Sequence, residues 1–269
     1  MSRPAPDTSR RGPATAVATA LALAGGSLAA RQVLRLQARQ ARRTIGKSLG
    51  EEAHRADGTY KKKYGDPVRL LVLGDSIAAG LGAETARQTL GAQLARRLAK
   101  RTTRSVQLHV AAIVGAETSM LRAQLAGLPT GYRPDVAVVV VGGNDVTHRV
   151  RISDSVQHLR EAVVALQGLG CEVVVGTCPD LAALTAVPQP LRALGGLSSR
   201  RLAEAQRAAV TALGARAVPL AEVVGPFFVA QPDEMFAVDR FHPSGAGYRR
   251  TAKALLPSIV EALEARARS

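Results

Sequence analysis

The hydrophobic pattern switches repeatedly between short continuous runs and helical spacing over most of the chain after residue 66. The short apolar runs predict five strands, at residues 70–73, 106–114, 136–141, 172–176 and 217–223. Helical spacing predicts five helices, at residues 85–101, 119–128, 154–169, 198–215 and 244–266. Pro257 should kink or split the last helix. Because strands and helices alternate, we expect a three-layer α/β domain around a mostly parallel five-stranded sheet.

The first 65 residues have a different pattern and are expected to precede a globular domain of residues 66–269. Residues 12–30 carry no charge, follow a basic start and are rich in alanine, which is typical of a signal or anchor segment. Residues 31–49 have an apolar helical face flanked by arginines: Leu34, Ala38, Ala41, Ile45 and Leu49, with Arg35, Arg39, Arg42 and Arg43. The polar residues 50–66 are expected to form a linker.

A basic amphipathic helix indicates that residues 12–49 bind an anionic membrane surface, and the alternative is a helix packed on the domain. Positive charge is heavier after the uncharged run than before it, which argues against moving the C-terminal side across a membrane. We therefore expect a membrane-associated or exported protein, and a location on the cytoplasmic face stays open.

The net charge of +15 over 269 residues is concentrated near the N-terminus, because residues 1–66 alone carry +8. The chain has no zinc-finger spacing, RNA-binding aromatic motif or basic region followed by heptads, so a nucleic acid partner is not expected. Cys171 and Cys178 flank one predicted strand, and seven residues of strand span about 23 Å. This separation is far too long for a disulfide, so we expect two free thiols.

Residues suited to nucleophilic catalysis follow two predicted strands and precede the last predicted helix. Ser76 follows the first strand, Asn144 follows the third, and Asp239 and His242 come just before the last helix. We expect them to converge, because the carboxyl ends of parallel strands share one edge of the sheet. His242 can take the serine proton near neutral pH, and Asp239 can orient its imidazole. Each segment taken alone is equally compatible with an ordinary turn or a helix cap.

Four short motifs occur in a specific order: Gly74-Asp75-Ser76, Gly115, Gly143-Asn144-Asp145 and Asp239-x-x-His242-Pro243. With these motifs, residues 66–269 resemble the SGNH hydrolases, the GDSL esterase/lipase superfamily. The resemblance implies a flavodoxin-like three-layer fold and a triad of Ser76, Asp239 and His242. It also implies an oxyanion hole made by the N–H groups of Ser76 and Gly115 and the side-chain amide of Asn144. One departure is that Ala111-Ala112-Ile113-Val114 precede Gly115, where the superfamily usually carries an asparagine.

These observations predict a serine ester hydrolase, of the esterase or lysophospholipase kind, that acts on lipid or other small acyl esters. The alternatives are a carbohydrate O-deacetylase of the same superfamily and a non-catalytic α/β domain tethered to the envelope. No cofactor or metal is expected, because there is no Cys/His cluster and the glycines match neither a P-loop nor a dinucleotide fingerprint.

Two further features are compatible with a site near His242. A group of large apolar residues should either wall an acyl pocket or fill the core: Phe227, Phe228, Phe236, Phe241 and Met235. Residues 181–196 are mostly apolar, are interrupted by prolines and are expected to form a loop over the site. Asp75 and Asp145 are expected to be structural partners within their turns.

Overall fold

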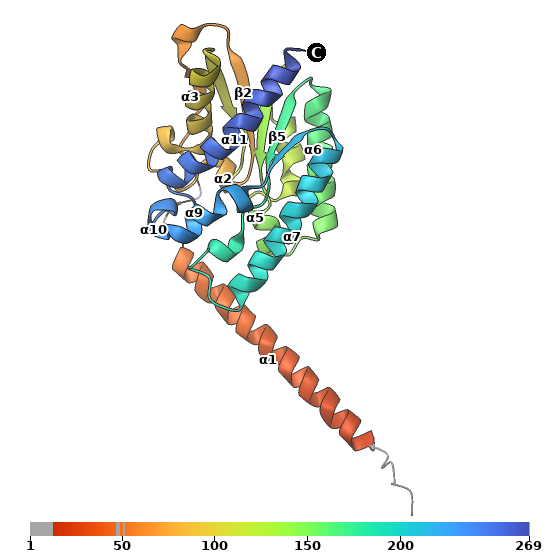
Figure 1. The fold of residues 1–269 in the computed structure, drawn as a ribbon. Coiled ribbons are helices and arrows are strands. Elements are labelled where there is room, and N and C mark those ends of the chain that lie inside the picture. The colour runs from red at the N-terminus through yellow and green to blue at the C-terminus, as the bar shows by residue number, and fades with distance from the viewer. Residues whose placement is uncertain (1–12, 47–48, 51, 269) are drawn as a thin grey trace, which may run out of the picture.

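A six-stranded sheet forms the centre of the protein, for which the computed structural model describes residues 13–46, 49–50 and 52–268 (Figure 1). The strands are β1 (Gly58–Tyr60), β2 (Val68–Gly74), β3 (Val106–Val110), β4 (Val136–Val140), β5 (Glu172–Gly176) and β6 (Arg216–Val218). Their order in the sheet is β1-β3-β2-β4-β5-β6, and all neighbours are parallel except β1 and β3. The expected three-layer architecture with a mostly parallel sheet is therefore confirmed.

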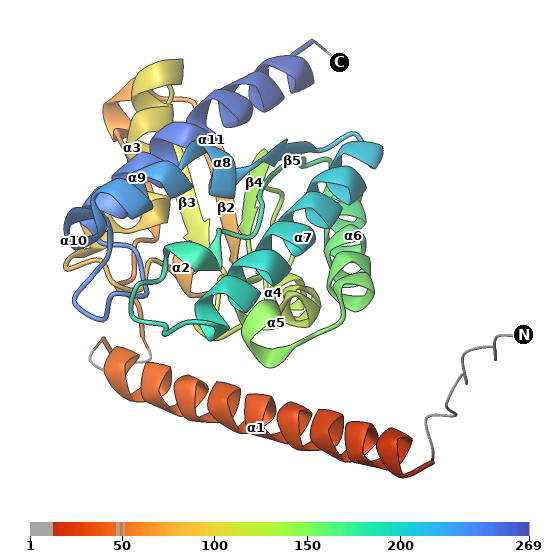
Figure 2. The same cartoon turned by 60° about the horizontal axis from the view of Figure 1, so that its bottom comes forward.

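Helices cover both faces of the sheet (Figures 1 and 2). Four long helices do so: α3 (Leu90–Thr102), α6 (Ile152–Gly168), α7 (Leu191–Ala212) and α11 (Gly245–Arg266), while the longest helix, α1 (Pro13–Ile45), lies outside these layers. The shorter ones are α2 (Ser76–Ala79), α4 (Leu121–Ala126), α5 (Gly143–His148), α8 (Leu220–Val223), α9 (Gly225–Ala230) and α10 (Pro232–Met235). Short 3-10 turns are η1 (Lys62–Tyr64), η2 (Ala86–Gln88), η3 (Thr118–Met120) and η4 (Leu181–Ala183).

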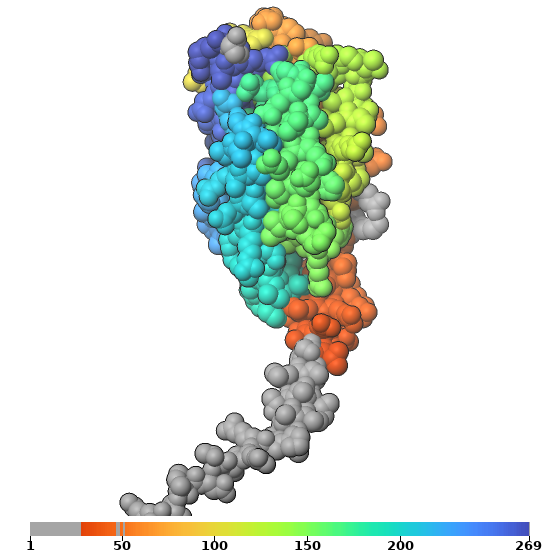
Figure 3. Space-filling view, turned by 90° about the vertical axis from the view of Figure 1, so that its right-hand side faces the viewer, coloured from red at the N-terminus to blue at the C-terminus, as the bar shows by residue number. Residues whose placement is uncertain are grey.

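Two hydrophobic cores lie on opposite faces of the sheet, which explains why the central strands read as continuous apolar runs. Leu70 and Val72 of β2 face the core shared with α3 and α11. Leu71 and Leu73 of the same strand face the core shared with α4, α6 and α7. Figure 3 shows α6 and α7 side by side over this second face, in green and cyan. Because both faces are covered, every residue of β4 is buried.

The structure corrects three expectations about strands and helices. The sheet has six strands instead of five, because the segment expected as a linker contributes the short antiparallel edge strand β1. Strand β3 ends at Val110, and residues 217–223 form the end of β6 followed by α8. Pro219 lies between these two elements and has no N–H to continue a strand ladder.

Pro257 does not split the last helix, which runs continuously from Gly245 to Arg266. Proline removes the hydrogen bond that its N–H would donate to the carbonyl of Lys253. Both residues are exposed, so water can satisfy that carbonyl. The helix therefore tolerates the proline at this position.

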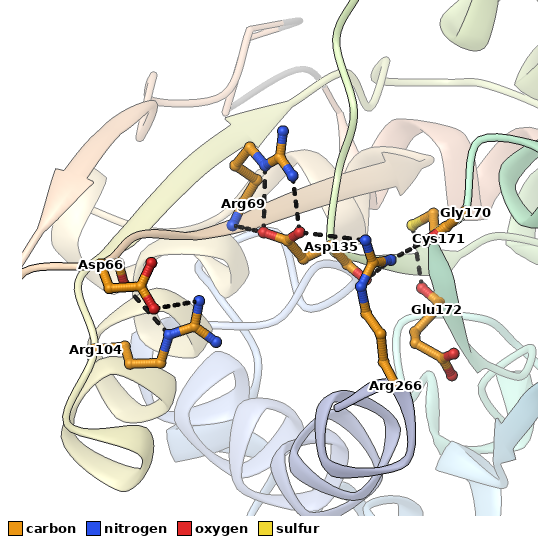
Figure 4. A network of polar contacts seen from close by, with 8 residues as sticks. All are labelled: Asp66, Arg69, Arg104, Asp135, Gly170, Cys171, Glu172 and Arg266. Atoms are coloured by element: carbon orange, nitrogen blue, oxygen red, sulfur yellow. Dashed lines mark hydrogen bonds and ion pairs between the residues drawn. The ribbon is translucent and has the colours of Figure 1, made fainter. Parts of the chain in front are cut away.

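A network of ion pairs holds the end of α11 at the amino-terminal edge of the sheet (Figure 4). Asp135, just before β4, binds Arg69 of β2 through two side-chain contacts of 2.9 and 3.3 Å, and Arg266 lies 3.6 Å away. Burial raises the pKa of Asp135, but the hydrogen bonds from Arg69 outweigh this and hold the pKa below its usual value. Arg266 is the last residue of α11, and the helix begins at the opposite edge with Gly245, three residues after His242.

Helix α1 extends away from the domain, and its C-terminal part packs on the domain near the start of α7 (Figures 1 and 2). The side chain of Gln37 accepts a hydrogen bond from the N–H of Leu191 and donates one to the carbonyl of Gln189. Ala41 is buried, while Arg35 and Arg39 are exposed. The predicted apolar face thus turns at least partly toward the domain. Residues 1–12, including the basic start, lie outside the described residues.

No helix within residues 13–268, apart from the gaps at 47–48 and 51, combines the length and apolar character needed to cross a bilayer.

Candidate active site

Ser76 lies on a sharp turn between β2 and α2, at the carboxyl edge of the sheet. The turn requires glycine at position 74, where φ is +132° and a Cβ would lie 1.9 Å from the carbonyl oxygen of Val140. Asp75 then caps α2, because its Oδ1 accepts a hydrogen bond of 2.9 Å from the N–H of Ile77. Ser76 becomes the first residue of α2 and is 7% exposed. The expected position of the serine after the first apolar run is therefore observed.

His242 and Asp239 reach Ser76 from a tight loop before α11. The Nε2 of His242 lies 3.0 Å from the Oγ of Ser76, and its Nδ1 lies 2.6 Å from the Oδ2 of Asp239. The other carboxylate oxygen of Asp239 accepts 3.0 Å hydrogen bonds from the N–H groups of Phe241 and His242. The three side chains form one continuous hydrogen-bonded chain, although 166 residues separate Ser76 from His242.

The environment of Asp239 favours its charged form. Burial raises the pKa of this carboxyl, but the hydrogen bond with His242 and those from two backbone N–H groups more than offset burial, so the pKa is below its usual value. Asp239 is 4% exposed, and its Oδ2 faces the Nδ1 of the His242 imidazole. A charged carboxylate in this place can hold an imidazole in one orientation and stabilise its protonated form.

Asn144 lies beside Ser76, in the first turn of α5, which follows β4. Its side-chain amide donates a 3.0 Å hydrogen bond to the carbonyl of Ala116, which uses one of the two N–H bonds of that amide. The next residue, Asp145, accepts a 3.0 Å hydrogen bond from the N–H of Thr118 through Oδ2. These two contacts tie the loop after β3 to the turn after β4.

Gly115 lies in that tied loop, immediately before Ala116, and does not end a strand as the sequence had suggested. It is exposed and has a φ of +81°, in the region that favours glycine. Gly115 does not line the cavity described below. The structure therefore brings Ser76, His242 and Asn144 together at one cavity, with Asp239 on the far side of the His242 ring, and holds Gly115 in the adjoining loop.

Asp75 is the most strongly perturbed carboxyl beside the serine. It is 2% exposed, and burial raises its pKa to about 6, although hydrogen bonds from the N–H groups of Ile77 and Gly143 and the charge of His242 act in the opposite direction. Because it joins the turn at Ser76 to the turn at Gly143, Asp75 has the structural role expected of it. Asp145 has a comparable role through Thr118.

A cavity of about 80 Å³ opens beside Ser76. Apart from the residues already described, its walls are mostly apolar and come from η4, α8, α9 and the loop before α11: Leu181, Ala183, Leu184, Leu220, Val224, Phe228, Phe236 and Phe241. Three of the four phenylalanines thus line it, whereas Phe227 packs under the guanidinium of Arg250 at 4.0 Å. Met235 is buried and does not line the cavity.

Of the segment 181–196, which was expected to form a loop over the site, Leu181, Ala183 and Leu184 line the cavity. Residues 191–196 do not belong to a loop, because they form the first turns of α7. Sequence reasoning missed Leu220 and Val224, which it placed in a strand or beyond it. The only signal for them was an apolar segment following Pro219, which does not reveal a pocket wall. Cys171 and Cys178 are free and buried, as expected. In the described part of the chain, no group of three or more His, Cys, Asp or Glu side chains is arranged to hold a metal ion.

Comparisons with known proteins support the same assignment of family and fold. A model of the GDSL-like lipase/acylhydrolase family matches residues 72–250. The GDSL-like esterase Rv1075c of Mycobacterium tuberculosis is 42% identical over 262 residues, which cover 93% of this chain and 83% of that protein.

Solved structures share the fold at low sequence identity. A lipase/acylhydrolase from Enterococcus faecalis superposes with a TM-score of 0.55 at 20% identity, covering 75% of this chain and 96% of that one. A catalytic mutant of Axe2, an acetylxylan esterase from Geobacillus stearothermophilus, gives a TM-score of 0.53 at 18% identity, covering 71% of this chain and 94% of that one.

Proposed function

Because the chain belongs to the GDSL-like lipase/acylhydrolase family and is an ester-hydrolysing enzyme, we propose that Ser76 is its nucleophile, with His242 as general base and Asp239 as the orienting carboxylate. The observation that carries this proposal is the unbroken hydrogen-bonded chain from Asp239 through His242 to Ser76. A serine hydroxyl is a weak nucleophile until a neighbouring base removes its proton, and His242 is that base for Ser76.

The reaction then follows from the positions of these atoms. The Oγ of Ser76 attacks the ester carbonyl carbon while the Nε2 of His242 takes the hydroxyl proton. Collapse of the tetrahedral intermediate breaks the bond to the alcohol oxygen, and His242 returns the proton to that oxygen. Water, activated by the same imidazole, hydrolyses the acyl-serine to release the acid. Asp239 stays ionised throughout, because its role is to orient and stabilise the imidazolium.

We further propose that the oxyanion of the intermediate is bound by the N–H groups of Ser76 and Gly115 and by the amide of Asn144. The hydrogen bond to Ala116 leaves Asn144 a second N–H to donate, and Asn144 lines the cavity next to Ser76. The same contact keeps Gly115 close to this turn. Donors held in place before the reaction stabilise the developing charge without reorganisation.

The assignment of Ser76 can be tested with a fluorophosphonate label and a p-nitrophenyl ester. The label should attach to the wild-type protein and be absent from Ser76→Ala, which should also lose hydrolysis while its circular dichroism spectrum is unchanged. Ser244→Ala is a matched control, because Ser244 caps α11 in the same region and does not touch the triad. Undiminished turnover by purified Ser76→Ala would rule out this nucleophile.

We also propose that α1 binds an anionic membrane surface. Charge complementarity supports this, because the exposed side of the helix carries Arg31, Arg35, Arg39, Arg42 and Arg43. Leu28, Val33 and Leu36 are 64%, 46% and 51% exposed, so apolar side chains lie beside the arginines. The packed end of α1 contacts the start of α7 at Leu191. The segment just before α7 carries Leu181, Ala183 and Leu184, which line the cavity. A docked α1 would therefore hold the active site close to lipid.

Vesicle sedimentation of the full-length protein tests this interaction. Phosphatidylglycerol-containing vesicles should bind the protein, and replacing Arg35 and Arg39 by glutamine should weaken binding about 30-fold, since each basic residue contributes about 1 kcal/mol near such a surface. The control replaces Lys100 and Arg101, two exposed basic residues of α3, by glutamine. Equal binding by the two double variants, or no binding by the wild type, would contradict the proposal.

A further inference from the structure

The strands β2 and β4, which lead into the active site, lie next to each other, and each loses its outer neighbour before it reaches the site. Strands β2 and β3 pair as far as Val72 and Val110. Strands β4 and β5 pair as far as Val140 and Gly176. The buried peptide groups beyond these pairs need other hydrogen-bond partners, because an unpaired peptide group in the interior is unfavourable.

Gln124 of α4 takes the place of the departed strand beside β2. Its Oε1 accepts a hydrogen bond of 2.9 Å from the N–H of Gly74, and its Nε2 donates one of 2.8 Å to the carbonyl of the same residue. A carboxamide has both the donor and the acceptor of a peptide group, so it can stand in for one. Gln124 is 3% exposed. It therefore fixes, from the interior, the peptide at which the turn to Ser76 starts.

Gln206 of α7 fills the matching place between β4 and β5. Its Oε1 accepts a hydrogen bond of 2.7 Å from the N–H of Cys178, and its Nε2 donates one of 3.1 Å to the carbonyl of Val141. The side chain is fully buried, and a Cβ on Gly142 would lie 3.1 Å from its Nε2. The carboxamide therefore lies directly against the glycine that begins the turn to Asn144.

The two turns held by these glutamines have the same construction. Gly74 and Gly142 both have a φ of +132°, a conformation that other residues rarely adopt. Each is followed by a short helix whose start carries a group of the proposed machinery, Ser76 in α2 and Asn144 in α5. Because glycine is conformationally permissive, the direction of each short helix depends on what holds the peptide groups before it. A misplacement of about 1 Å at a reacting group can lower the rate about 100-fold.

We propose that Gln124 and Gln206 are positioning residues of this esterase. Gln124 sets the position of the Ser76 hydroxyl, and Gln206 sets that of the Asn144 amide. Neither glutamine lines the cavity beside Ser76, so each acts through the turn that it holds. The inference rests on the proposed function, because it assumes that Ser76 is the nucleophile and that Asn144 binds the oxyanion.

Replacing Gln124 by methionine removes the carboxamide and keeps the length of the side chain. The N–H of Gly74 loses this partner, while its carbonyl keeps the 3.1 Å hydrogen bond from the N–H of Ile113. Gln124→Met should lower kcat about 30-fold and leave KM nearly unchanged, because the cavity walls are untouched. Gln93→Met is the matched control and should keep wild-type kcat, since Gln93 is also buried but bonds Arg97 within α3.

A double-mutant cycle separates positioning from a general effect on the fold. Gln206→Met should lower kcat about tenfold in the wild type but less than about twofold in Asn144→Ala, because the group that it positions is then absent. Gln124→Met should keep its full loss in Asn144→Ala, because it acts on Ser76. The assay uses the full-length enzyme and one soluble p-nitrophenyl ester, with folding checked by circular dichroism and urea titration.

Gln124→Glu provides a second measurement that does not depend on the methionine variant folding. A neutral carboxylic acid offers the same donor and acceptor as the amide, whereas a carboxylate only accepts and would face the carbonyl of Gly74. Burial favours the neutral acid at low pH. The kcat of Gln124→Glu relative to the wild type should therefore fall at least about tenfold from pH 5.5 to 9.

Failure of this inference is distinguishable from failure of the proposed function. If Ser76→Ala retains full activity, or Asn144→Ala keeps wild-type kcat, the proposed function itself is wrong. If both behave as expected, three results would overturn the inference: folded glutamine variants with kcat within threefold of the wild type, an equal loss in Gln93→Met, or a pH-independent ratio for Gln124→Glu. Losses of Gln206→Met and Asn144→Ala that simply multiply would show that Gln206 does not act through Asn144.

Discussion

Replacing Asp239 by asparagine tests whether the carboxylate controls the working nitrogen of His242. In the wild type, Oδ1 of Asp239 is held by the N–H groups of Phe241 and His242, and Oδ2 faces Nδ1 of the imidazole. In Asp239→Asn, the two backbone donors require the amide oxygen to stay in the Oδ1 position. The amide NH₂ must then face Nδ1, which can only accept a hydrogen bond in that arrangement.

This constraint places the imidazole proton on Nε2, where it faces the Oγ of Ser76 at 3.0 Å. His242 can then no longer accept the serine proton without first changing tautomer. The loss of kcat from fixing the wrong tautomer in a Ser–His–Asp enzyme is about 10⁴-fold, which corresponds to about 5.5 kcal/mol in the activation free energy. Because the pKa of Asp239 lies below its usual value, the carboxylate is charged at neutral pH. The carboxylate that the substitution removes is therefore charged from about pH 6 to 9.

The assay is kcat and kcat/KM on one soluble p-nitrophenyl ester across that pH range. The matched control is Asp233→Asn, because Asp233 is also an acidic residue of the segment before α11, but it is exposed and pairs with Arg240 at 2.8 Å. It should retain wild-type activity. A loss in Asp239→Asn of less than about tenfold, at unchanged folding, would refute the tautomer argument.

Three other perturbations have definite expected outcomes. Asn144→Ala should lower kcat by about 10²–10³, the loss typical of one oxyanion donor, and a change confined to KM would show that Asn144 only binds substrate. In the folded protein the pKa of Asp75 is about 6, which is above its unfolded value. The native state therefore binds more protons than the unfolded state between about pH 4 and 6, and the free energy of unfolding should fall by about 3 kcal/mol as the pH rises through this window. Urea titrations should lack this decrease in Asp75→Asn, and an identical pH dependence in both proteins would contradict the burial argument. Asp135→Ala leaves Arg69 and Arg266 without their shared carboxylate and should lower the free energy of unfolding by about 1–3 kcal/mol without changing KM, a result that urea titration and ester kinetics would check.

Local patterns in the sequence were sufficient to predict the features whose signal is carried by residues close together in the chain. A strand that is covered on both faces has apolar residues without polar alternation. The continuous apolar run before Gly74 therefore predicts a buried strand, and β2 is buried along most of its length. Asp239 and His242 could be paired from their three-residue spacing, since one turn brings their side chains together. By contrast, β1 has only three residues and no alternating pattern, so its place in the sheet depends on pairing with β3.

The order of the motifs along the chain indicated the family, but the contacts that make a site were decided by the tertiary structure. Ser76 meets His242 only because the sheet brings the end of β2 to the start of α11, across 166 residues of sequence. The cavity walls come from six separate segments of the chain, and no periodicity relates Leu184 to Leu220 or Phe228. The raised pKa of Asp75 likewise arises from burial, which depends on packing and not on its neighbours in sequence. Residue types and spacing therefore specify which groups can react, while long-range packing determines their distances, their charge states and the shape of the space beside them.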